Sequence, residues 1–63
     1  MGMPDKIKNY LKQRGETTGG EILREFASGT RASRVMLALY GLELAGRIRS
    51  EERNQKIYYR LAV

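Results

Sequence analysis

Residues 35–48 read VMLALYGLELAGRI, and this stretch decides the fold of the 63-residue chain. Its apolar side chains recur at helical spacing, so a helix over residues 31–45 should pack one face on the core. The core positions of that face are Val35, Leu39 and Leu42. Gly46 should end the helix, because glycine readily adopts the left-handed conformation that follows many helices. Ile48 then begins an extended segment.

The last part of the chain alternates between apolar and polar residues. Residues 56–61 read KIYYRL, and one apolar residue in two is typical of a strand with one buried face. The residues of the expected core face are Ile57, Tyr59 and Leu61. Together with Ile48, this pattern predicts an antiparallel hairpin over residues 47–61, with Arg53 and Asn54 at or near its tip.

Two further helices are predicted in the first half. A proline in the first turn and a glycine just past the end bound a helix over residues 4–14. Thr18 and Glu21 fit a capping box, in which each side chain satisfies a free backbone N–H at the start of a helix. A second helix is therefore expected over residues 19–28. A glycine-containing turn then leads to the helix over 31–45, which is the helix-turn-helix pattern.

The order of elements predicts an α+β winged helix-turn-helix. Three helices are followed by a two-stranded antiparallel β-hairpin, the wing, and a short strand near residues 16–18 is possible. Because 63 residues suffice for one small domain, residues 1–63 are interpreted as a single winged-helix domain.

Composition excludes several classes of function. The chain has no cysteine and no histidine, which removes thiol nucleophiles, histidine bases, disulfides and nearly all zinc sites. We therefore expect no enzyme, no catalytic residue, no cofactor and no bound metal. No apolar run approaches the length of a membrane span, and the N-terminus lacks the apolar core of a signal peptide. A cytoplasmic protein that does not enter membranes is the expectation.

The formal net charge of +5 favours a polyanion as partner. In winged-helix proteins the outward side of the third helix usually enters the major groove of DNA. Arg34 could form bidentate hydrogen bonds with a guanine edge, Ser33 could bind a base or phosphate, and Arg31 and Tyr40 could bind backbone phosphates. Gly41 would let a sugar-phosphate strand approach closely.

The predicted wing adds further candidates for DNA contact. These are Arg49, Arg53, Asn54 and Lys56. A structural role is the alternative, since charges on an edge strand prevent strand-to-strand aggregation. If six phosphates were neutralised, log affinity would fall with log salt at a slope of about −5.

One feature differs from a simple reader of DNA sequence. Leu37, Tyr40 and Leu44 form a second apolar stripe on the outward side of the third helix. The helix over residues 4–14 or the N-terminal arm could cover this stripe. Alternatively, the stripe could contact a protein partner or a second copy in a homodimer, and Leu37 and Tyr40 could also touch DNA.

Two segments resemble known winged-helix proteins. ALYGLELAGRI, residues 38–48, is similar to the C-terminal winged helix of the DNA-processing protein of natural transformation. YYRLA, residues 58–62, is similar to the wing exit of small bacterial and archaeal transcriptional regulators, including the arsenic-repressor type. The resemblance covers about residues 18–61. It implies double-stranded DNA binding by a small transcriptional regulator or, alternatively, a protein-interaction winged helix; metal sensing does not carry over without cysteine or histidine.

A third resemblance is to winged helices that bind Z-DNA. Tyr40 matches the position of a tyrosine that packs on the nucleic acid in that family. Met36, however, stands where the family has asparagine, and the wing has neither tryptophan nor a proline pair. These departures place this interpretation behind the other two.

Overall fold

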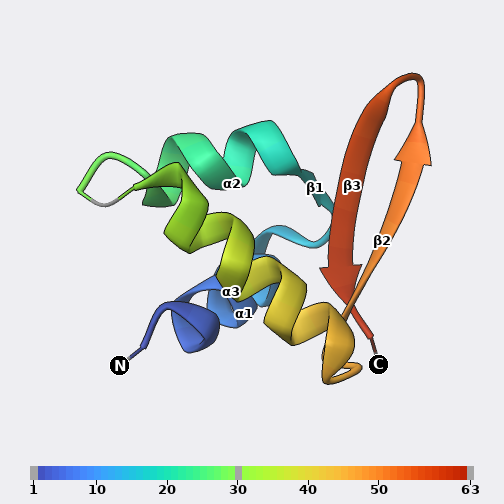
Figure 1. Ribbon diagram of the computed structural model, residues 1–63. Coiled ribbons are helices and arrows are strands. Elements are labelled where there is room, and N and C mark those ends of the chain that lie inside the picture. Colours follow the sequence, from blue (N-terminus) through green and yellow to red (C-terminus); the bar gives the residue numbers. More distant parts are fainter. Residues whose placement is uncertain (1, 30, 63) are drawn as a thin grey trace.

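The computed structural model describes residues 2–29 and 31–62, and it contains three helices and three strands in this part of the chain (Figure 1). In chain order these are α1 (Met3–Arg14), β1 (Thr17–Thr18), α2 (Gly19–Phe26), α3 (Ala32–Leu44), β2 (Ile48–Arg53) and β3 (Lys56–Leu61). The predicted winged helix-turn-helix is confirmed, and β1 lies where a short strand was thought possible.

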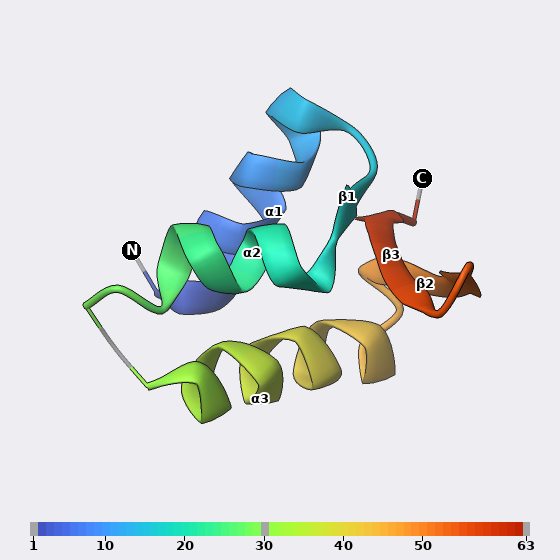
Figure 2. The ribbon, with the colours of Figure 1, turned by 90° about the horizontal axis from the view of Figure 1, so that it is seen from above.

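The three strands form one antiparallel sheet in the order β1-β3-β2. Strand β3 lies in the middle, with Tyr59 opposite Thr17 of β1 on one side and opposite Ser50 of β2 on the other. Figures 1 and 2 show the helices gathered into one cluster, with the β2–β3 hairpin standing beside the C-terminal end of α3. The wing is thus joined to the helices through both β1 and α3.

The hydrophobic core is assembled from all three helices and the base of the hairpin. The buried apolar side chains are Ile7, Leu11, Ile22, Val35, Leu39, Leu42, Ile48 and Tyr59. The stripe of α3 predicted from its spacing is therefore the face that packs inward. At the edge of the core, the rings of Tyr10 and Phe26 meet edge to face, with their centroids 5.4 Å apart, an arrangement that aromatic rings favour.

Helix α3 ends in a hydrogen-bonded glycine cap. Gly46 has φ of +73°, its N–H donates to the carbonyl of Glu43 at 3.0 Å, and the N–H of Arg47 donates to the carbonyl of Leu42 at 2.9 Å. This is the Schellman arrangement that satisfies the last carbonyls of a helix. The helix therefore stops where predicted, and the chain turns directly into β2.

At the start of α2, one of the two hydrogen bonds of the predicted capping box is formed. The backbone N–H of Glu21 donates to the Thr18 hydroxyl at 3.2 Å. The Glu21 carboxylate instead accepts a hydrogen bond of 2.5 Å from the hydroxyl of Thr17, a residue that is almost fully buried. The polar group of Thr17 is thereby satisfied inside the protein, as a buried hydroxyl requires.

The helix boundaries differ slightly from those expected. Helix α2 was expected over residues 19–28 but ends at Phe26, with Ala27 as its C-cap. Phe26 is the last side chain of this helix that packs against the core, and the serine and glycine that follow are weak helix formers. Helix α1 begins one residue earlier than expected, at Met3. Helix α3 was expected over residues 31–45, but Arg31 and Ala45 are its caps and not part of the helix.

The hairpin tip is a tight two-residue turn. Asn54 and Gln55 both have positive φ, at 53° and 65°, as a type I′ turn requires. This turn suits the right-handed twist of the strands, but residues other than glycine, asparagine and aspartate seldom adopt its backbone conformation.

Gln55→Gly should therefore stabilise the protein. Removing the left-handed strain should raise the free energy of unfolding by about 0.5–1 kcal/mol, after allowing for the extra chain entropy of glycine. Urea unfolding followed by circular dichroism measures this change. Asn54→Gly is the matched control and should gain less, because asparagine tolerates the left-handed region; an equal gain at both sites would contradict the explanation.

Candidate nucleic-acid interface

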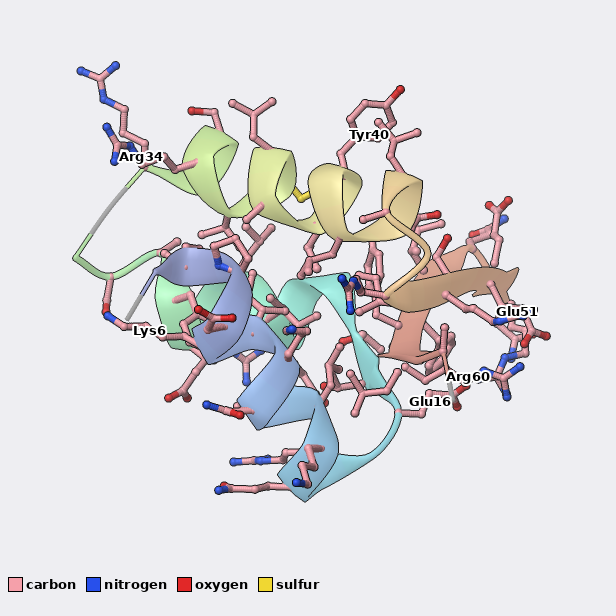
Figure 3. All side chains as sticks on the ribbon, turned by 90° about the horizontal axis from the view of Figure 1, so that it is seen from below. Lys6, Glu16, Arg34, Tyr40, Glu51 and Arg60 are labelled. Atoms are coloured by element: carbon pink, nitrogen blue, oxygen red, sulfur yellow. The ribbon has the colours of Figure 1, made fainter. Side chains whose placement is uncertain are left out.

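The outward face of α3 is apolar and uncovered. Leu37, Tyr40 and Leu44 are 69%, 61% and 71% exposed, and Figure 3 shows Tyr40 pointing away from the body of the protein. Neither α1 nor the described N-terminal residues cover this stripe, so the explanation that the protein itself buries it is wrong. A contiguous exposed apolar face of this kind marks an interaction site more often than a chance surface.

Two apolar residues that the sequence did not identify as site residues extend this surface toward the wing. Met36 and Ile57 are 43% and 40% exposed, and both line a groove of about 500 Å³ between α3, the start of α2 and the wing. Ile57 was expected in the core. It lies on the expected face of the sheet, two residues from the tight turn, but it borders an open groove beside α2 and α3 and so stays partly exposed.

Polar candidates cluster at the beginning of α3. Arg31 is the N-cap residue of the helix, and Ser33 and Arg34 follow in its first turn, all of them exposed. Figure 3 shows Arg34 and Tyr40 toward opposite ends of the same helix. Gly41, the residue after Tyr40, is exposed, and no heavy atom outside its own stretch of helix lies within 4 Å of the position that a Cβ would take. The helix thus presents cations at one end and an apolar surface along the remainder.

The wing candidates do not all face the same way. Cross-strand partners share a sheet face, and the pairs on the face opposite the core are Arg49 with Arg60, Glu51 with Tyr58, and Arg53 with Lys56. Arg49 and Arg53 therefore point away from the side on which α3 packs. Asn54 lies in the exposed turn, and Lys56 also lines the groove beside Met36. Among the predicted wing residues, Lys56 therefore shares the outer sheet face with Arg53 but borders the groove near the turn.

Arg53 is engaged with the protein itself. Its guanidinium forms a hydrogen-bonded ion pair with Glu16, lies over the Tyr58 ring at 4.1 Å from the centroid, and has Nε 3.6 Å from a carboxylate oxygen of Glu51. The hydrogen bond to Glu16 is the main cause of a raised pKa of Arg53. Spacing along the chain could not reveal this, because Glu16 lies far from Arg53 in the sequence.

A polar contact also joins the wing to α3. The hydroxyl of Ser50 donates to the Glu43 carboxylate at 2.7 Å, linking β2 to the last turn of α3. Ser50 is opposite Tyr59 in the sheet; burial, and secondarily the negative charge of Glu43, raise the pKa of the Tyr59 hydroxyl. Tyr59 therefore stays neutral at physiological pH and acts as a core side chain.

Within residues 2–29 and 31–62, no cluster of three or more acidic side chains could hold a metal ion. In the same part of the chain, no helix has both the length and the apolar character needed to cross a membrane. What the described surface offers is an apolar helix face, a neighbouring groove and a few cations.

Three solved structures share this fold closely. No protein-family model and no curated protein sequence matches the chain. The apo-Zalpha of zebrafish PKZ superposes with a TM-score of 0.82 at 24% identity, over 97% of this chain and 92% of the other. The Zalpha domain of Carassius auratus PKZ in complex with Z-DNA gives 0.76 at 25% identity, over 94% and 90%. PKZ Zalpha in complex with ds(CG)6, in a hexagonal crystal form, gives 0.75 at 26% identity, over 90% and 89%.

These similarities support the winged-helix part of the predicted resemblance, but not its arsenic-repressor part. All three structures are of the Zalpha type, which the sequence placed last because of Met36 and the composition of the wing. The underlying reason is that core spacing is common to many winged helices, so it could not rank one type above another.

The exposed stripe should contribute little to folding. Leu37→Gln should change the free energy of unfolding by less than about 0.5 kcal/mol, because an exposed helical position tolerates substitution. Leu39→Ala, two residues further along α3 and on its buried face, should cost about 2–5 kcal/mol. Chemical denaturation of both variants measures the difference, and a large loss for Leu37→Gln would show that the stripe is part of the core.

Proposed function

We propose that this protein binds double-stranded DNA through the outward face of α3 and the adjoining groove of the wing. The observation that carries the proposal is the position of the exposed large apolar residues. Among the described residues, these are Met36, Leu37, Tyr40, Leu44 and Ile57, and all of them belong to α3 or β3. Arg31 and Arg34 at one end, and Lys56 at the wing, supply positive charge for the phosphates.

The chemistry of this face favours recognition of duplex shape over reading of base edges. Direct readout in the major groove depends on hydrogen bonds from side chains to bases. Between Arg34 and the end of α3, the outward face offers the Tyr40 hydroxyl and otherwise apolar groups. Apolar and aromatic contacts suit a duplex whose base surfaces are accessible. We therefore propose a left-handed CG-repeat duplex as the preferred ligand, supported by the two similar domains in complex with Z-DNA and ds(CG)6.

A role as a small transcriptional regulator is the cellular function we propose for this contact. Arg34 is the α3 residue capable of bidentate bonds to guanine, so it is the source of any base preference. Met36 departs from the asparagine of the Z-DNA-binding family. Met36 borders the groove beside the face of α3 that carries Tyr40. Because its side chain is apolar, polar contact with the DNA backbone should be weaker than an asparagine would give, whereas apolar contact should be kept.

Tyr40→Ala should lower affinity for ds(CG)6 by roughly 10-fold to 100-fold, because a base–aromatic contact is worth about 1–3 kcal/mol. Fluorescence anisotropy measures the affinity, and inversion of the circular dichroism spectrum of the DNA reports the left-handed form. An AT-rich duplex of equal length is the control. If the unmodified protein binds both duplexes equally and without inversion of the spectrum, the preference for left-handed DNA is contradicted. If the unmodified protein binds neither duplex, the proposed function is contradicted.

The affinity for DNA should depend less steeply on salt concentration than it would if six phosphates were neutralised, the case considered in the sequence analysis. Arg31 and Arg34 of α3, with Arg24 and Lys56 at the groove, are the cations beside this surface, so the slope of log affinity against log salt should be about −3.5, not about −5. Titrations at four or more salt concentrations measure it. A slope of about −5 or steeper would mean that the other wing arginines also bind phosphate.

A protein partner is the competing function for the same stripe. Leu44 is 71% exposed at the end of α3 farthest from Arg31 and Arg34, where contact with DNA phosphates has least support. Sedimentation of the free protein separates the functions: a homodimer that Leu44→Glu converts to a monomer, without change in DNA affinity, would favour protein interaction. A monomer whose Leu37→Glu variant loses DNA affinity would favour the proposed function.

A further inference from the structure

The outer half of the wing has little backbone support from the rest of the sheet. Strand β1 pairs with β3 at Tyr58 and Tyr59 and does not extend toward the tip. Beyond this point, β2 and β3 pair with each other alone in the described sheet. A two-stranded hairpin is marginally stable by itself. The angle between the tip and α3 must therefore be fixed by side chains.

Arg53 supplies such a contact on the face of the sheet opposite the core. Its guanidinium crosses from β2 over the Tyr58 ring of β3 and ends on Glu16, immediately before β1. One side chain thus links the outer end of the wing, the middle strand and the segment that enters the third strand. On the other face, the bond from Ser50 to Glu43 ties β2 to α3. The hairpin is held from both sides.

The location of this link separates it from the proposed DNA surface. Figure 3 places Glu16 and Glu51, both partners of Arg53, on a different side of the molecule from Tyr40. The Arg53 guanidinium is engaged with two carboxylates and an aromatic ring on this side of the molecule. Exposed ion pairs add little to global stability, so the main effect of this pair should be on the orientation of the wing.

We propose that Glu16 and Arg53, with Tyr58 between them, are positioning residues that hold the wing at the angle at which the groove beside α3 accepts a duplex. This inference rests on the proposed DNA-binding function. It assigns Arg53 a role different from the phosphate contact expected from the sequence, and it assigns a role to Glu16, an acidic residue outside the interface. Holding the wing in place before binding reduces the entropy lost when the complex forms.

The decisive comparison is between Glu16→Gln and Glu52→Gln. Each substitution removes one negative charge, and Glu52 has no ion pair within the described residues while lying on the same hairpin, opposite Ile57. Glu52→Gln should bind ds(CG)6 as well as the unmodified protein or better, because repulsion of phosphate is reduced. Glu16→Gln should bind about fivefold more weakly than Glu52→Gln, within the range of coupling seen for residues in one network.

A double-mutant cycle identifies how Arg53 acts. Arg53→Gln should weaken binding in the unmodified protein but have almost no further effect in Glu16→Gln, because the link is already broken. If Arg53 instead binds phosphate, Arg53→Gln will weaken binding equally in the unmodified protein and in Glu16→Gln, and it will flatten the salt slope by about one unit. That result, or equal affinity of Glu16→Gln and Glu52→Gln, would overturn the proposal.

Nuclear magnetic resonance relaxation tests the positioning role without DNA. Backbone amides of residues 50–57 should become more mobile in Glu16→Gln and remain unchanged in Glu52→Gln, while the helices keep their spectra. Equal wing mobility in the two variants would overturn the inference whether or not DNA binds. Absence of duplex binding by the unmodified protein would refute the proposed function separately, so the two failures are distinguishable.

Discussion

Strand β3 is held by backbone hydrogen bonds on both sides, and the arrangement of the helices and the wing depends on this position. Its Tyr59 is buried against the helices, opposite Thr17 and Ser50. A Cβ at Gly19 would lie 3.3 Å from the Tyr59 ring, so the start of α2 packs tightly on the strand. Through these contacts β3 sets the positions of β1, α2 and β2 together, which gives a short chain a defined wing.

The same arrangement frees one face of α3 for function. Val35, Leu39 and Leu42 supply the inward contacts of the helix, so the stability of α3 does not require the outward residues. Evolution can therefore change the outward face without loss of the fold. The leucine, methionine and tyrosine residues there form an exposed surface that is mainly apolar and aromatic, with Arg31 and Arg34 at its N-terminal end.

The sequence was sufficient to predict the fold because its signals are local. The apolar spacing in α3, the glycine after it and the alternation in β3 each specify one element, and their order specifies the winged helix. The site was less predictable because it depends on contacts between distant segments. Nothing near Arg53 in the sequence indicates its pairing with Glu16, and the exposure of Ile57 depends on the open groove that α2, α3 and the hairpin form beside it.

The type of winged helix was the least accessible property. Core residues have similar spacing across such proteins, and a match at Tyr40 is a single position. The structural similarity to Zalpha domains comes from the complete arrangement of helices and strands, which no short segment of sequence contains. A preference for one form of DNA, as proposed, would depend on the residues of the outward face rather than on the shared fold.

The pairing of β1 with β3 also has a consequence for the folding pathway. The β2–β3 hairpin and the α2–α3 pair join neighbouring parts of the chain, whereas the pairing of Thr17 with Tyr59 closes most of the chain into a loop. Contacts between residues far apart in sequence carry a larger closure entropy and slow the folding of small proteins. The local units can thus form early, and the two-residue strand β1 joins the sheet in the step that completes the native state.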